Sequence, residues 1–170
     1  MYPISRRAAL LALALAATPV LADPVEDFYK GKTLEMIIPA SAGGDYDIRG
    51  RLIARALPKF IPGRPTIVAR NMPGGIGLAA ANYMTKIAPR DGTALHIIFQ
   101  NMPSLQAINA PGVEYDVRRF GWLGNTTKTP NVITSWHTTG ITKIADVMTK
   151  ELVVGAPGAA STSYIYPAAM

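Results

Sequence analysis

The sequence predicts an α/β fold built on a parallel sheet. Three short apolar runs, at 34–38, 66–70 and 93–99, are typical of buried strands. Two segments with apolar residues at helical spacing separate these runs. A strand–helix–strand–helix–strand order of this kind is joined by crossovers, which place the strands parallel in one sheet.

The first strand, 34–38, ends at Pro39 and is followed by a loop of small residues, 40–47. From Ile48 we expect a helix, because apolar residues then recur with helical spacing at Leu52, Ile53, Ala56 and Leu57. Proline and glycine within 61–65 end this helix.

The second strand, 66–70, leads into a glycine-rich turn at 71–77. The helix that follows has one apolar face, formed by Ala80, Tyr83, Met84 and Ile87. A turn at 89–92 precedes the third strand, 93–99, which is apolar at nearly every position and is therefore predicted to be buried on both faces. Residues 101–117 contain scattered proline, glycine and asparagine and are predicted to be a long connection.

The last part of the chain predicts the start of a second α/β unit. Strand candidates lie at 120–124, 132–136 and 152–155, with a helix at 141–150 that turns Ile141, Ile144, Ala145 and Met148 to one side. A second small-residue loop, 156–161, follows, and Ser161 or Ser163 is placed to cap a further helix. We therefore expect one unit at 23–122 and an incomplete second unit at 123–170.

Residues 1–22 are predicted to be a secretory signal peptide. Basic residues at Arg6 and Arg7 precede an apolar run at 8–15 that is too short to span a bilayer, and 20–22 offers a cleavage site after Ala22. An uncleaved anchor is the alternative. The paired arginines also resemble a twin-arginine signal, so the export route is open. We expect the protein in a bacterial periplasm.

The composition limits the chemistry. The sequence has no cysteine, which excludes disulfides and thiol catalysis. Without Arg6 and Arg7, 15 basic residues face 11 acidic ones, a net charge of +4. This mild excess favours anionic small molecules or surfaces. It is too diffuse for nucleic acid, because no basic run exceeds two residues.

Three small-residue loops, 39–47, 71–77 and 155–163, lie where a strand leads into a helix. The first turn of a helix carries unpaired N–H groups and the positive end of the helix dipole, so it can bind a carboxylate. We interpret 39–47 and 155–163 as two backbone clamps on an acid. The alternative is that they are simply short connections.

The segment Gly75-Ile-Gly77-Leu-Ala-Ala80 matches the G-x-G-x-x-A pattern of a dinucleotide-binding turn. We reject that interpretation for three reasons. The next strand ends in Phe99-Gln-Asn101 without the acid that holds a ribose, the turn follows the second strand instead of the first, and export removes the nicotinamide pool. No cofactor is therefore expected.

Other catalytic or metal-binding patterns are weak. His96 is predicted to be a hydrogen-bonded core residue and His137 to be solvated in a loop. Two histidines far apart in the sequence, without any cysteine, do not form a set of metal ligands. No G-x-S-x-G elbow is present. Asp45 and Asp47 are interpreted as helix caps, with acid–base chemistry as the alternative. We predict no catalytic residue and no metal.

Several segments together resemble one family. The motifs at 28–33, 43–47, 71–74 and 88–92, with later segments at 115–120, 136–140 and 163–167, resemble the Bug-type solute receptors of tripartite tricarboxylate transporters. The resemblance runs from Phe28 to the end of the chain. It departs from the family pattern at Ile76, where a second glycine is usual, and at Tyr46, where many members have a small residue.

The resemblance implies a periplasmic-binding-protein-like clamshell with a parallel sheet in each lobe. Such receptors are roughly twice this length, so the second lobe would be truncated here. The two lobes would close on a small organic acid, gripped by backbone N–H groups and water, without a cofactor, and membrane subunits of the transporter would receive it. The implied ligand-binding residues are Ser41, Ala42, Gly43, Gly44, Asp45, Tyr46, Asp47, Gly74, Gly158, Ser161 and Thr162.

Two other functions are open from the sequence. The chain could be a secreted enzyme acting on an anionic small molecule, with Asp47 or His137 in acid–base roles. It could also be a truncated remnant that binds nothing.

Overall fold

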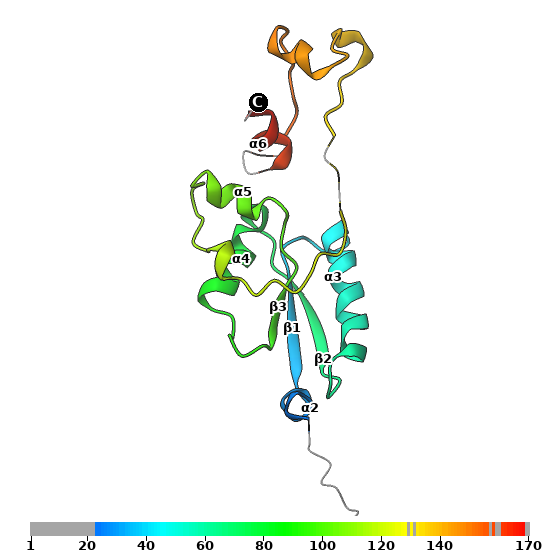
Figure 1. The fold of residues 1–170 in the computed structure, drawn as a ribbon, viewed down its shortest axis with the longest axis vertical. Coiled ribbons are helices and arrows are strands. Elements are labelled where there is room, and N and C mark those ends of the chain that lie inside the picture. The colour runs from blue at the N-terminus through cyan, green and yellow to red at the C-terminus, as the bar shows by residue number, and fades with distance from the viewer. Residues whose placement is uncertain (1–22, 129, 131, 157, 159–160, 169–170) are drawn as a thin grey trace, which may run out of the picture.

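The computed structural model describes residues 23–128, 130, 132–156, 158 and 161–168. The predicted signal peptide, 1–22, lies outside this range. The structure contains a parallel sheet of three strands, β1 (Thr33–Ile38), β2 (Thr66–Asn71) and β3 (Ala94–His96), in the order β2-β1-β3 (Figure 1). The predicted α/β class and parallel sheet are confirmed, and the sheet is compatible with one lobe of a clamshell.

The strand register brings the loops that follow the strands to one end of the sheet. Ile38 pairs with Asn71 and Ile37 pairs with His96, so β1 and β2 end at the same level. Met72 N–H continues the pairing with a hydrogen bond of 2.7 Å to Ile38 O. The loops after parallel strands are where α/β folds place their ligands.

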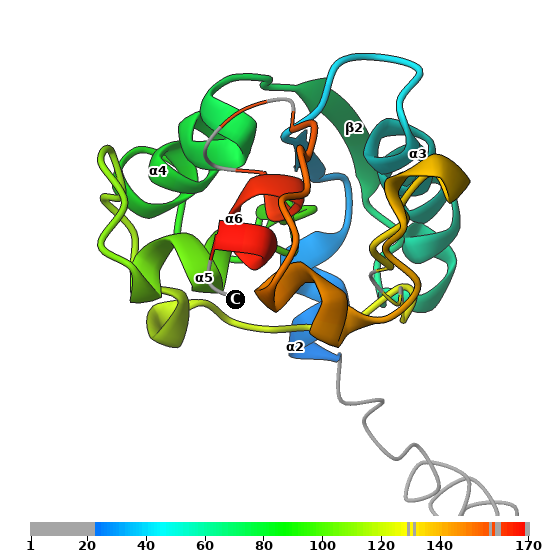
Figure 2. The same cartoon turned by 90° about the horizontal axis from the view of Figure 1, so that it is seen from above.

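Helices cover both faces of the sheet. Helix α3 (Asp45–Ala56) packs Ala54 against Met36 and Ile38 on one side. Helices α4 (Leu78–Lys86) and α5 (Met102–Ala107) lie on the other side (Figures 1 and 2). There a second core cluster contains Ala81, Met102, Leu105, Tyr115 and Ile165. The central strand β1 is consequently buried on both faces, as its continuous apolar sequence predicts.

The remaining helical elements are short. Helix α2 (Pro24–Tyr29) precedes β1 and is capped by Asp23, whose carboxylate accepts the Val25 N–H. Short 3₁₀ helices follow α3 and lie in the later loops: η1 (Leu57–Phe60), η2 (Gly75–Gly77), η3 (Val117–Arg119), η4 (His137–Thr139) and η5 (Ile144–Met148). Helix α6 (Thr162–Ala168) is the last element. Within the described residues, no helix is long and apolar enough to cross a membrane.

Two predictions for the first unit need correction. The third strand is shorter than 93–99 and only half-buried, because β3 lies at an edge of the sheet. The predicted connection at 101–117 contains α5 and η3. Pro103 does not prevent α5, since a proline is compatible with the first turn of a helix. Met102 and Leu105 bury their side chains there and stabilise it.

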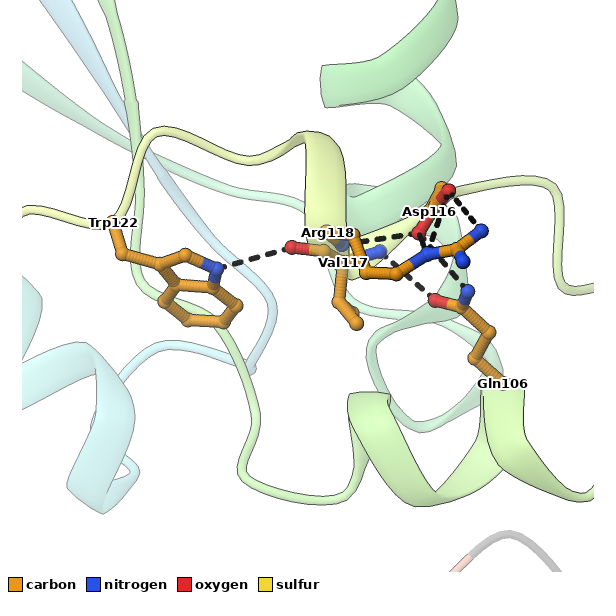
Figure 3. A network of polar contacts seen from close by, with 5 residues as sticks. All are labelled: Gln106, Asp116, Val117, Arg118 and Trp122. Atoms are coloured by element: carbon orange, nitrogen blue, oxygen red, sulfur yellow. Dashed lines mark hydrogen bonds and ion pairs between the residues drawn. The ribbon is translucent and has the colours of Figure 1, made fainter.

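A polar network fastens the chain after α5 to that helix (Figure 3). Asp116 accepts hydrogen bonds from Gln106 and Arg118, and the Gln106 Oε1 atom accepts the Val117 N–H over 2.8 Å. The Arg118 guanidinium holds the pKa of the Asp116 carboxyl well below its usual range. The Trp122 indole N–H donates to Val117 O over 3.0 Å. These contacts tie the segment 116–122 to α5.

The predicted second unit differs most from the sequence expectation. Strands do not form at 120–124 or 152–155, nor in the described residues of 132–136, and the helix predicted at 141–150 is reduced to η5. A strand requires a neighbour that pairs its N–H and C=O groups, and no strand pairing involves these segments among the described residues, although 132–134 and 152–155 line the same pocket. Leu123 and Val153 are 84% and 89% exposed.

The described residues of 121–156, which we call the arm, extend away from the sheet, whereas α6 lies closer to it (Figure 1). Ile165 of α6 is buried in the same cluster as Met102 and Tyr115. The division of the chain into two lobes stays a prediction.

Candidate functional site

The candidate site lies at the carboxyl ends of β1 and β2. Loop 40–44 follows β1 and leads into the first turn of α3. Ser41, Ala42, Gly43, Gly44 and Asp45 are all exposed, Tyr46 is half-buried and Asp47 is buried. The loop therefore presents backbone and small side chains to solvent, while its last acid turns inward.

The Asp47 carboxylate is the centre of a hydrogen-bond network. Its Oδ2 atom accepts the Gly43 N–H over 2.8 Å, which folds loop 40–44 back onto the helix. Arg51, one helical turn later, donates its Nε–H to Oδ1 and Oδ2 of Asp47 at 2.9 and 3.0 Å. The i,i+4 spacing places these two side chains side by side.

Asn71, the last residue of β2, completes the network. Its Nδ2 group donates to Asp47 Oδ1 and to the backbone Ala40 O, both at 2.8 Å. Its Oδ1 atom accepts a hydrogen bond of 2.7 Å from Arg51 Nη2. One side chain thus connects the end of β2 to both ends of the loop that follows β1.

These contacts determine the charge state of Asp47. Hydrogen bonds from Arg51, Gly43 and Asn71 lower the pKa of Asp47 from 3.8 to about 2. At neutral pH the group is a carboxylate that already accepts several hydrogen bonds. Such a group positions its neighbours and is poorly suited to exchange protons with a substrate near pH 7.

The predicted capping role of the two acids is wrong in detail. Helix α3 begins at Asp45, and its N-cap residue is Gly44, which makes no side-chain capping bond. Both acids lie in the first turn, where negative charge is favourable to the helix dipole. Asp45 forms an exposed ion pair of 2.8 Å with Arg49.

Loop 40–44 and the first turn of α3 can accommodate an anion. The first N–H groups of a helix have no acceptor within it. The two acids of the first turn are each paired with an arginine of α3, so their charges are offset locally. Gly43 has a φ of +85°, which glycine adopts at low cost and which directs its N–H at Asp47.

An aromatic pair connects this loop to the glycine turn. The Tyr46 and Phe99 rings meet edge to face with centroids 4.3 Å apart. Phe99 also lies against Gly77, where an added Cβ atom would come within 2.6 Å of the ring.

The second small-residue loop lies beside the glycine turn. The Ile76 side chain is near Gly158, where an added Cβ atom would be 3.6 Å from Ile76 Cδ1. Ser161 is buried, and its hydroxyl donates to Gly158 O over 2.7 Å. Its carbonyl accepts the Ile165 N–H, so Ser161 leads into α6, which begins at Thr162. Gly74 is exposed, at the start of the glycine turn.

The two histidines take different places. His96 lies in β3 as predicted, but its buried Nε2 atom has no hydrogen-bond partner among the described residues, contrary to the prediction of a hydrogen-bonded histidine. Burial lowers the pKa of His96 to about 4. His137 is exposed and contacts the Trp136 ring. Across the part of the chain that the structure describes, no group of three or more His, Asp or Glu side chains could hold a metal ion.

Three residues that support the site were not identified as such from the sequence. Arg51 lies between the apolar positions of a predicted helix, Asn71 belongs to a family motif, and Phe99 ends a predicted strand. The i,i+4 spacing of Asp47 and Arg51 is a signal that could have indicated their pairing. The contacts of Asn71 and Phe99 depend on the strand register, which the sequence does not give.

Comparison with known proteins gives one relationship. No family model matches the chain, and no solved structure matches it. Over 115 residues the chain is 27% identical to Protein BugT of Bordetella pertussis (strain Tohama I). This match covers 67% of the chain and 34% of BugT, so the chain spans about a third of that relative. The chain is a distant relative of the Bug family.

Proposed function

We propose that the chain is the ligand-binding part of a periplasmic solute receptor. It captures a small carboxylate-bearing ligand and delivers it to the membrane subunits of a tripartite tricarboxylate transporter. The distant relationship to a Bug protein supports the receptor class. The observation that carries the proposal is the exposed loop 40–44, held in place by Asp47, Arg51 and Asn71.

The chemistry of binding follows from this loop. A carboxylate placed before the first turn of α3 accepts hydrogen bonds from N–H groups of residues 41–46 other than those of Gly43 and Gly44, which already donate to Asp47 Oδ2 and Ser41 O, and it interacts favourably with the helix dipole. Small side chains at 41–44 let the ligand approach the backbone. The Asp47 network fixes the loop before the ligand arrives, which reduces the entropy lost on binding.

The second contact to the ligand comes from Gly158, Ser161 and Thr162. The approach of Gly158 to Ile76 of the glycine turn supports an arrangement in which Gly158, Ser161 and Thr162 contact the ligand from a different side than loop 40–44. Closure of the two lobes then encloses it. No catalytic step is required, because binding and release are sufficient for a receptor.

A binding titration tests the proposal. Isothermal titration calorimetry of the purified protein with small mono-, di- and tricarboxylates should give saturable binding, and the matched amides should give none. Asn71→Ala should weaken the carboxylate affinity by about tenfold or more, because loop 40–44 loses its tie to β2.

Asn82→Ala is the matched control. The Asn82 side chain likewise makes more than one hydrogen bond, to Gly112 O and from the Glu114 N–H, and none of them involves loop 40–44. This variant should keep the wild-type carboxylate affinity. The absence of saturable carboxylate binding, or chemical conversion of a bound acid, contradicts the proposal. Export is checked separately by the intact mass of the periplasmic protein, which should begin at Asp23.

A further inference from the structure

A cavity lies at the end of the sheet opposite to loop 40–44. It has a volume of about 360 Å³ and is formed between the end of α2 and residues 59–64, which follow α3. These segments precede β1 and β2, whereas loop 40–44 follows β1. We call this cavity the basal pocket; its lining includes Glu26, Lys30, Lys59, Phe60, Gly63 and Arg64.

The two walls of the basal pocket meet through their backbones. Gly63 has a φ of +81°, and an added Cβ atom would lie 2.6 Å from Glu26 O and 2.7 Å from Lys30 N. Only glycine permits this approach. The spacing of the walls is therefore fixed by the backbone, and the pocket exists before any ligand binds.

Arg64 has a backbone conformation that its side chain does not favour. Its φ is +44°, a left-handed conformation that glycine or asparagine adopts more easily. Pro65 follows directly and further restricts the residue before it. Arg64→Gly therefore removes the side chain while it relieves the backbone, which makes this variant a clean probe of the side chain.

The charges of the basal pocket are unbalanced. Lys30, Lys59 and Arg64 face a single acid, Glu26. Every ion pair found among the described residues involves other side chains. Three cations that outnumber the one acid around a cavity attract an oxyanion, and the guanidinium fork can bind it through two N–H groups.

One wall of the basal pocket is apolar. Phe60 is 80% exposed and stands next to Ile61 and Pro62. The pocket volume is at the lower end of the range for small-molecule sites. Outside the pocket, Asp23 and Asp27 of α2 reduce the positive charge, which favours a compact ligand over a lipid or nucleic-acid surface.

We propose that the basal pocket binds a small oxyanion with an apolar ring or chain. Arg64 and Lys59 hold the carboxylate or phosphate group, and Phe60 packs against the apolar part. The basal pocket shares no residue with the proposed carboxylate site at loop 40–44, so experiments can refute one proposal without refuting the other.

The test is an ¹H–¹⁵N NMR titration of the purified protein with phenyl phosphate. The amide signals of Lys30 and Gly63 should shift and saturate, and they should do so equally in Asn71→Ala, the variant that weakens the anion site at loop 40–44. Inorganic phosphate, which lacks the ring, should bind about fivefold more weakly. Arg64→Gly should weaken the affinity for phenyl phosphate by about tenfold. Because glycine suits this backbone conformation, the variant should fold.

Two controls separate the site from general effects. Arg119→Gln removes an exposed positive charge elsewhere, on η3, and should leave the affinity unchanged. Asn109→Gly relieves another left-handed residue, with a φ of +50°, away from the pocket and should also have no effect. Unsaturated shifts up to about 20 mM phenyl phosphate, or equal affinity in Arg64→Gly, would overturn the proposal. Equal affinity for inorganic phosphate would refute the role of Phe60.

Discussion

The Asn71 side chain donates a hydrogen bond of 2.8 Å to Asp47 Oδ1 and thereby joins the end of β2 to the first turn of α3. The two residues are 24 positions apart in the sequence, and only the pairing of β1 with β2 brings them together. The loop that we propose to bind a carboxylate depends on this contact.

Asn71→Ala should lower the free energy of unfolding by about 1–3 kcal/mol, because Asp47 and Ala40 O each lose a donor. Urea denaturation of the wild type, Asn71→Ala, Asp47→Ala and the double variant measures the coupling. The decreases in the free energy of unfolding of the two single variants should add up to more than the decrease in the double variant. Strict additivity would show that the two side chains act independently.

The contribution of Asp47 should disappear in acid. Its pKa in the folded state is about 2, below the ordinary value of 3.8, so its stabilising effect is present above pH 4 and is lost as the pH falls towards 2. The melting temperature of Asp47→Asn should therefore lie below that of the wild type at pH 6 and approach it at pH 2. A difference that does not depend on pH would contradict the charge-dependent role.

His96 should make the stability depend on pH in a higher pH range than Asp47 does. Its pKa falls from 6.5 to about 4 on folding, so the unfolded chain binds the proton more readily. Stability should therefore decrease as the pH falls from about 6.5 to 4, by about 1.4 kcal/mol per pH unit at most. His96→Leu should remove this slope in denaturation experiments at several pH values. The exposed His137→Gln variant should retain it.

Gly77 should not tolerate a side chain. Its φ is +93°, and a Cβ atom would come within 2.6 Å of the Phe99 ring. Gly77→Ala should cost about 2 kcal/mol or more in urea denaturation, through backbone strain and displacement of that ring. Gly121→Ala, where a Cβ atom meets nothing within 4 Å and φ is not left-handed, should change stability little.

Helix α6 should depend on Ile165 for its attachment. Ile165→Ala removes the α6 side chain that is buried with Met102 and Tyr115, and should cost about 2 kcal/mol. Amide hydrogen exchange within α6 should accelerate more than exchange in β1. Tyr164→Ala, at a half-exposed position of the same helix, is the control and should have a smaller effect.

The sequence predicts the parts of the fold that depend on local pattern. The run at 34–38 is bounded by a proline after it and the run at 66–70 by a proline before it, and strands form at both places as expected. Leu152–Gly155 has an equally strong strand composition but forms no strand, because composition does not supply a pairing partner.

In the candidate site, too, some features can be predicted from the sequence and others depend on the fold. The exposed small-residue loop is evident from Ala40 to Gly44. Its support by Asn71 is not evident, because a side-chain amide at the end of a strand acquires a partner only once the register is known. The unpaired Nε2 atom of His96 likewise depends on burial by segments distant in sequence.

The exposed arm has a consequence for how the chain is held together. Its backbone is accessible to proteases, and a single cut there would separate α6 covalently from the sheet. The buried contacts of Ile165 and the Gly158–Ile76 approach would still connect the two pieces. A nicked chain should therefore migrate as one particle under native conditions and as two fragments in denaturant. The dissociation constant of the smaller fragment would then measure the strength of the contacts that bind α6 to the rest of the protein.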